Sequence, residues 1–134
     1  MSGEADTVQK SSSKRVVLVA DDDPLLLRMN EIVLSELGFT VVLAASGREA
    51  QQRLADAGGA IDLVVLDQRM PDMDGTTVMR EALKQWPGLR ILLVTGYATE
   101  EVMRDSKRAG VSEVLEKPYD IHTLSKAVMR VLSL

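Results

Sequence analysis

The chain has 134 residues, of which 46% are hydrophobic and 27% are charged, enough for one globular domain with a buried core. Its formal net charge of −4 gives no electrostatic support for nucleic-acid binding, and no apolar run approaches the length of a membrane span. The sequence contains no cysteine, which excludes disulfides, thiolate nucleophiles and cysteine-based metal sites. We therefore expect a cytoplasmic protein that binds neither nucleic acid nor a membrane through this chain.

The first residues, Met1–Lys14, are polar, small and aperiodic, and they predict a disordered tail ahead of one domain over residues 15–134. In that domain, apolar runs of strand length alternate with helical patterns. The expected strands are Arg15–Ala20, Thr40–Ala44, Leu63–Leu66, Arg90–Val94 and Ser112–Glu116. The expected helices begin after Asp23, at the S-x-x-E capping box Ser46–Glu49, at Gly75, at about Thr99 and after Asp120.

The expected helices differ in the apolar surface that they offer to a core. The first helix presents one apolar stripe, formed by Leu26, Met29, Val33 and Leu37. The helix from about Thr99 to Ala109 is mostly charged, and only Val102 and Met103 stand out as apolar anchors. We expect it to be the weakest helix of the chain.

Five strands that are each followed by a helix predict an α/β fold, a (βα)5 doubly wound, five-stranded parallel sheet. The carboxyl ends of parallel strands meet at one edge, where open α/β sheets bind their ligands. The side chains that directly follow the strands should gather in a crevice there: Asp21, Asp22, Asp67, Thr95 and Lys117. Neighbouring carboxylates repel one another, and a divalent cation relieves this repulsion. Because the ligands are hard oxygens, we expect Mg²⁺.

The same crevice residues suggest a chemistry. Taken alone, Asp67 could equally cap a turn, and Asp21–Asp23 could simply cap a helix. Beside Lys117 and Thr95, however, a carboxylate can attack phosphorus and form an acyl phosphate. Mg²⁺, the Lys117 ammonium and the Thr95 hydroxyl would then each meet one oxygen of the transferred group.

Four segments carry a resemblance to a known family: VLVADDDP, VVLDQRMPDMDG, LLVTGY and VLEKPY. Their order and spacing are similar to those of the response-regulator receiver domain, the CheY-like module of bacterial two-component signalling. The resemblance runs from about Arg15 to the carboxyl terminus. It implies a flavodoxin-like sheet with the strand order 2-1-3-4-5.

The resemblance also implies a role for each residue of the acidic crevice. Asp67 would be the phosphoacceptor, and Lys117 would contact the phosphoryl group. Asp22 would bind Mg²⁺ directly and Asp21 would bind it through water. Asp67 and the backbone carbonyl of Arg69 would complete the protein ligands of the metal.

The resemblance further implies a conformational switch, in which the hydroxyl of Thr95 moves toward the new phosphoryl oxygens. The Lys117–Pro118 peptide bond would be cis, as X-Pro bonds can be. The family usually has an aromatic residue three positions before the lysine, and this chain has Val114 there. Tyr97, two residues after Thr95, either supplies an aromatic gate instead or is an exposed loop tyrosine.

The function that the resemblance implies is signalling rather than enzymatic turnover. A histidine kinase or a histidine phosphotransfer protein would supply the phosphoryl group, and the chain would promote only its own phosphorylation and dephosphorylation. Output would pass to an unknown downstream protein through the face formed by helix 4, strand 5 and helix 5. The chain would act in a phosphorelay as a stand-alone receiver, or as part of a hybrid kinase or larger regulator.

Other functions stay open. Because Val114 departs from the family pattern, the fold could serve as a phosphorylation-independent adaptor. A Mg²⁺-dependent aspartyl-phosphate phosphatase of the haloacid-dehalogenase type also uses a strand-end aspartate, but its second aspartate falls where this chain has Arg69. Arg69 would either shield the acyl phosphate from water or be solvated. The P-loop pattern G-x-x-x-x-G-K-[ST] of nucleotide-binding proteins is absent.

Overall fold

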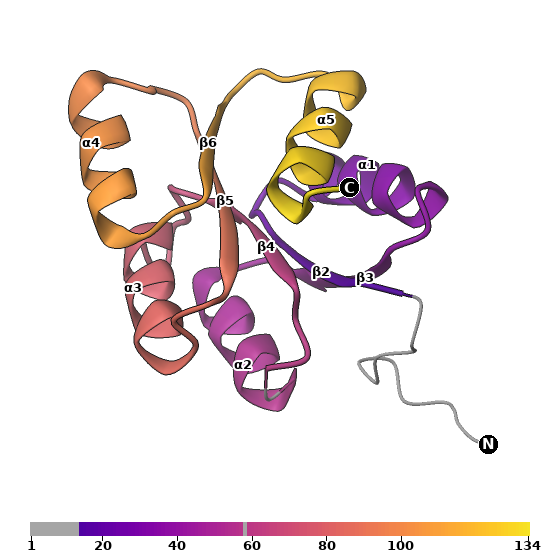
Figure 1. Ribbon diagram of the computed structural model, residues 1–134, viewed down its shortest axis with the longest axis horizontal. Helices are drawn as coiled ribbons and strands as arrows, with labels where there is room; N and C mark the ends of the chain where they lie inside the picture. Colours follow the sequence, from indigo (N-terminus) through magenta and orange to yellow (C-terminus); the bar gives the residue numbers. More distant parts are fainter. Residues whose placement is uncertain (1–13, 58) are drawn as a thin grey trace.

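The computed structural model describes residues 14–57 and 59–134, in which strands and helices alternate along the chain (Figure 1). The strands are β2 (Val16–Ala20), β3 (Thr40–Ala44), β4 (Leu63–Asp67), β5 (Arg90–Thr95) and β6 (Glu113–Glu116). The helices are α1 (Pro24–Glu36), α2 (Gly47–Ala57), α3 (Gly75–Gln85), α4 (Glu100–Ala109) and α5 (Ile121–Leu132). Of the tail predicted over residues 1–14, residues 1–13 lie outside the described part of the chain.

The strands form one sheet in the order β3-β2-β4-β5-β6, and every neighbouring pair is parallel. Counted along the chain, this is the order 2-1-3-4-5, which confirms the predicted fold class. Helices α1 and α5 cover one face of the sheet, and α2, α3 and α4 cover the other (Figure 1). Because all neighbouring strands are parallel, the carboxyl ends of the five strands of this sheet lie at one edge.

The central strands β2 and β4 are buried along their whole length, because helices cover both faces of the sheet. Successive side chains of a strand point to opposite faces, and the core is therefore divided in two. In β2, Leu18 packs on the side of α2 and α3, while Val17 and Val19 pack on the side of α1 and α5. This two-sided burial explains why the strands read as continuous apolar runs.

The predicted caps are present. The Asp23 carboxylate accepts hydrogen bonds from the backbone N–H groups of the first turn of α1, and the Asp120 carboxylate does the same for α5. At the start of α2, Ser46 Oγ accepts from the Glu49 N–H at 3.1 Å. The Glu49 carboxylate accepts a hydrogen bond from the N–H of Ala45. In an ideal capping box the donor would be the next residue, Ser46.

The predicted buried stripe of α1 is wrong at Leu37, whose side chain is 42% exposed. Helix α1 ends at Glu36 and Gly38 turns the chain with a φ of 97°, so Leu37 lies beyond the last helical turn. Leu34 and Asn30 face the core instead.

The two apolar anchors predicted for α4 are only partly correct. Val102 is half-buried, but Met103 is 45% exposed, and the buried residue of the helix is Ser106. Helix α4 is defined mainly by its ends, since Thr99 caps its first turn and Gly110 ends it in the left-handed conformation. Within residues 14–57 and 59–134, no helix is both long and apolar enough to cross a membrane.

Candidate phosphoacceptor site

The structure brings the predicted crevice residues together at the carboxyl edge of the sheet. Asp21 follows β2, Asp67 ends β4, Thr95 ends β5 and Lys117 follows β6. Asp21, Asp67 and Thr95 are 3%, 5% and 2% exposed, so these polar side chains are held inside the fold. Asp22, next in the chain to Asp21, is exposed to solvent.

The Lys117 ammonium bridges the two buried carboxylates. Its Nζ lies 3.2 Å from Asp67 Oδ2 and 3.4 Å from Asp21 Oδ2. Burial lowers the pKa of Lys117, but the charges of Asp21 and Asp67 outweigh burial and raise that pKa overall. Lys117 therefore stays protonated as a fixed positive charge against Asp67.

Asp67 is held in a position that resists its ionisation. Burial is the largest cause that raises the pKa of Asp67, and the charge of Asp21 is the second. Lys117 and the backbone N–H of Arg69, which lies 3.4 Å from Asp67 Oδ1, lower the same pKa but only partly offset the rise. A further positive charge near Asp67 and Asp21 would favour the ionised form.

The crevice has the donor set of a hard cation. Asp21, Asp22 and Asp67 each offer a carboxylate oxygen, and these oxygens all lie within 4.8 Å of one another. Oxygen ligands on one side, with an exposed Asp22 leaving room for water, suit Mg²⁺, which keeps several of its waters in protein sites. The residues present therefore fit the predicted metal.

The loop between β4 and α3 is fixed close to Asp67. The Gln68 N–H donates to the Val94 carbonyl, and the Gly75 N–H donates to the Gln68 carbonyl, both at 2.8 Å. A Cβ atom at position 75 would lie 2.1 Å from the Asp67 backbone oxygen, so only glycine fits there. At the far side of the loop, the Asp72 carboxylate accepts hydrogen bonds from the N–H groups that open α2.

The predicted switch residues lie beside this loop. The Thr95 hydroxyl donates to Gln68 Oε1 at 2.5 Å and accepts from the Tyr97 N–H at 3.1 Å. The Tyr97 side chain is 71% exposed, whereas Val114 is half-buried against the core. Gln68 was not among the predicted site residues. Its position as a polar residue directly after the central strand is the feature of the sequence that could have indicated it.

Two further predictions concern neighbouring residues. The Lys117–Pro118 peptide bond is cis, as the resemblance implied. Arg69 is exposed and lines an open hollow of about 490 Å³ together with Asp22 and Asp74.

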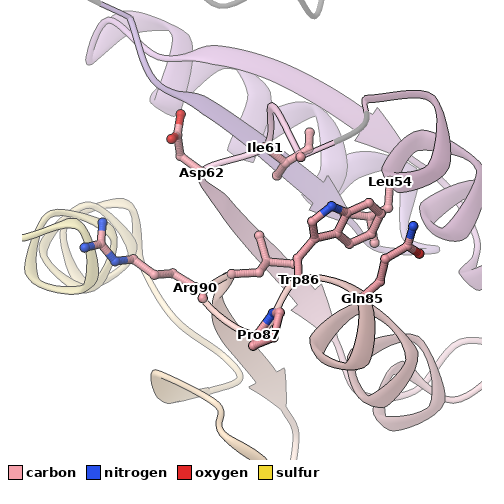
Figure 2. Close-up of a pocket in the computed structure, with 10 residues that line it drawn as sticks. Leu54, Ile61, Asp62, Gln85, Trp86, Pro87 and Arg90 are labelled. Carbon is pink, nitrogen blue, oxygen red and sulfur yellow. The ribbon is translucent and has the colours of Figure 1, made fainter.

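A second hollow, of about 380 Å³, lies at the opposite edge of the sheet (Figure 2). Trp86, Leu54 and Ile61 form its apolar wall, and Asp62 and Arg90 lie beside them. Asp62 directly precedes β4 and Arg90 begins β5, whereas Asp67 and Thr95 end the same two strands. This hollow is therefore separate from the acidic crevice.

Comparisons with known proteins agree with this geometry. Residues 17–129 match the family model of the response regulator receiver domain. The chain is 37% identical over 123 residues to the sensor kinase CckA of Brucella abortus, with 91% of this chain and 13% of the kinase covered. The chain thus spans only a small part of the curated relatives that it matches.

Solved structures share the fold. A CheY-like receiver domain protein from Methanospirillum hungatei is 30% identical with a TM-score of 0.84, covering 90% of this chain and 95% of the other. A chain from the complex of CheX and CheY with BeF3 and Mg²⁺ from Borrelia burgdorferi is 27% identical with a TM-score of 0.84. The match covers 88% of this chain and 89% of the other. Both similarities extend over nearly the whole described chain.

Proposed function

The chain belongs to the response-regulator receiver family of two-component signalling, and we propose that Asp67 is its phosphoacceptor. The donor is a histidine kinase or a histidine phosphotransfer protein, the partners with which receiver domains interact. The observation that carries this proposal is the Asp67 carboxylate at the end of the central strand, with the Lys117 ammonium 3.2 Å away and two further carboxylates beside it.

In the proposed reaction, an oxygen of the Asp67 carboxylate attacks phosphorus as the bond from phosphorus to the donor histidine nitrogen breaks. Lys117 already contacts Asp67 Oδ2, so its charge is in place to neutralise an oxygen of the transferred group. The Thr95 hydroxyl, on the neighbouring strand, is the donor for a second oxygen. The product is an acyl phosphate on Asp67.

Receiver domains bind Mg²⁺ at an acidic cluster of this kind. We propose that Asp22 binds the ion directly and Asp21 through water, with Asp67 and the Arg69 carbonyl as the remaining protein ligands. When bound, Mg²⁺ supplies positive charge to the carboxylates and to one phosphoryl oxygen. The presence of BeF3 and Mg²⁺ in the complex of a similar protein supports the choice of this ion.

Output in this proposal passes through contacts with another protein rather than through catalysis, and the protein acts in the cytoplasm. The face of α4, β6 and α5 is the proposed docking surface for the downstream partner. Thr95 ends β5 beside β6, so a movement of its side chain acts directly on this face. Val114, on β6, and Tyr97, after Thr95, are the proposed residues that respond to it.

The role of Tyr97 has its own test. The ring is exposed, and the Tyr97 N–H donates to the Thr95 hydroxyl, so a shift of this hydroxyl changes a contact of Tyr97 directly. The Tyr97→Ala variant should change the dephosphorylation rate or the phosphorylation-dependent binding of the partner. If both are unchanged, Tyr97 is not the gate.

The proposal is tested by intact mass after incubation with acetyl phosphate, with and without Mg²⁺. We expect a Mg²⁺-dependent gain of one phosphoryl group, which Asp67→Asn loses and the control Asp105→Asn, an exposed aspartate on α4, retains. An adduct that persists in Asp67→Asn contradicts the assignment of Asp67. If the wild type neither gains mass nor binds beryllofluoride with Mg²⁺, the phosphorylation-independent adaptor replaces this proposal.

A further inference from the structure

The one proton of the Thr95 hydroxyl is already donated in this state of the protein. A threonine hydroxyl has one proton to donate. The bond from Thr95 Oγ1 to Gln68 Oε1 is 2.5 Å long, whereas the alternative acceptor, the Tyr97 carbonyl, lies 3.4 Å away. Gln68 is therefore the main acceptor, and the lone pairs of Thr95 Oγ1 receive the Tyr97 N–H.

Gln68 is well placed to hold this contact, because its backbone is fixed on both sides. Its N–H donates to the Val94 carbonyl on β5, the residue directly before Thr95. Its carbonyl accepts from the N–H of Gly75, at the start of α3, which lies so close to the Asp67 backbone that a side chain would not fit there. The half-buried side chain thus starts from a backbone that is hydrogen-bonded on both sides, next to Asp67 in the chain and bonded to Thr95.

We propose that Gln68 is a positioning residue that holds Thr95 in the unphosphorylated state. This inference rests on the proposed function, in which Thr95 donates to an oxygen of the phosphoryl group on Asp67. The hydroxyl has a single proton, so the bond that it donates to Gln68 Oε1 must break before Thr95 can donate to the phosphoryl oxygen. Gln68 therefore sets part of the free-energy difference between the inactive and active conformations, without touching the reacting atoms.

Removal of the Gln68 acceptor should favour the active conformation. Gln68→Met keeps the length of the side chain but replaces the amide by a thioether, which is only a weak acceptor. Because the net contribution of one neutral hydrogen bond is small, we expect beryllofluoride with Mg²⁺ to bind about 2- to 10-fold more tightly to this variant. Ligands shift such equilibria only by their difference in affinity for the two states.

Isothermal titration of beryllofluoride in the presence of Mg²⁺ measures this effect. The wild type, Gln68→Met and the control Gln85→Met are compared, since Gln85 lies at the end of α3 beside the hollow of Figure 2. The control should bind like the wild type. Binding by the wild type tests the proposed function itself, and the ratio between Gln68→Met and the wild type tests the role of Gln68.

Thr95→Val distinguishes positioning of Thr95 from a direct action of Gln68 on the anion. In the Thr95→Val background, Gln68→Met should change the affinity by less than about 2-fold, because no hydroxyl remains to be released. Equal or weaker binding by Gln68→Met in the wild-type background overturns the inference. An equal gain with and without the Thr95 hydroxyl overturns it as well, because Gln68 would then act on the ligand.

Discussion

Asp67 occupies an environment that disfavours its own charge. Burial and the carboxylate of Asp21 raise its pKa above the usual range, and Lys117 with the Arg69 N–H only partly compensates. A carboxylate that water solvates poorly, next to an ammonium, is well prepared to attack phosphorus. The same features lower the stability of the folded protein when Asp67 is ionised.

We therefore predict that Asp67→Asn stabilises the Mg²⁺-free protein at neutral pH. The folded pKa of Asp67 lies above its ordinary value of 3.8, so the folded state binds the proton more tightly than the unfolded state does. The resulting loss of stability is complete above the folded pKa, and it disappears as the pH falls to 3.8 and below. Asparagine does not ionise and avoids this loss.

Urea unfolding without Mg²⁺ at pH 7 and at decreasing pH measures the difference between the two proteins. The advantage of Asp67→Asn should shrink as the pH falls, while the exposed control Asp105→Asn should stay within about 0.5 kcal/mol of the wild type. If Asp67→Asn is less stable than the wild type at pH 7, the interaction of Asp67 with Lys117 outweighs the burial of Asp67 and its repulsion by Asp21.

At this scale the sequence predicts which side chains reach the crevice, because parallel strands place their last residues at one edge. Asp67 and Thr95 end neighbouring strands, and their approach follows from the strand order alone. The bond between Gln68 and Thr95 does not follow from the pattern. It depends on the path of the loop back to Gly75 and on the side-chain conformation of Gln68.

Among the elements, the connection from β4 to α3 is held by close contacts at both of its ends. Its backbone lies against the end of β4 at Gly75, and its Asp72 caps the start of α2. The Asp72 carboxylate accepts hydrogen bonds from the backbone N–H groups of Gly47 and Arg48. These bonds, the one from Gly47 most, lower the pKa of Asp72. The connection therefore joins β4 to two helices, α2 and α3, on one face of the sheet.

Gly75→Ala should destabilise the protein by about 3 kcal/mol or more, because the added Cβ overlaps main-chain atoms that cannot move independently. The overlap is with the Asp67 carbonyl oxygen at 2.1 Å, so the start of α3 or the end of β4 has to shift. We also expect slower phosphorylation by acetyl phosphate. Urea unfolding and intact mass measure the two effects.

Gly88→Ala is the matched control for this substitution. A Cβ at position 88 meets no atom within 4 Å, and Gly88 is not among the glycines with positive φ. Its free energy of unfolding should change by no more than about 0.5 kcal/mol. Similar values for the two variants would mean that the backbone at Gly75 adapts at little cost.

The helices show where periodicity alone is insufficient. The stripe of α1 was predicted to continue to Leu37, but the helix ends before it at a turn through Gly38. In α4, the predicted anchor Met103 faces solvent and Ser106 faces the core. A charged helix that packs mainly on β6 is oriented by its neighbours and its caps, which a single-sequence pattern does not contain.

Across the whole molecule, strand order and helix placement follow from the alternating pattern and the family resemblance. The long-range polar contact between α1 and the segment before α5 does not. Asn30 Nδ2 donates to the Tyr119 hydroxyl at 2.8 Å across 89 residues of sequence. Asn30 is 1% exposed, and its Oδ1 has no partner among the described residues. This contact connects the first helix to the segment that carries Lys117.

Tyr119→Phe should therefore destabilise the protein by about 1–3 kcal/mol, because the buried Asn30 amide loses its remaining partner. Replacing both partners by apolar groups removes the unpaired donor, so Asn30→Leu combined with Tyr119→Phe should recover about 1 kcal/mol or more over Tyr119→Phe alone. Urea unfolding of the two single variants and the double variant gives this coupling.

Tyr97→Phe, at a side chain that is 71% exposed, is the control for the loss of a tyrosine hydroxyl. If Tyr119→Phe is no more destabilising than Tyr97→Phe, the contact does not stabilise the junction between α1 and the Lys117 segment.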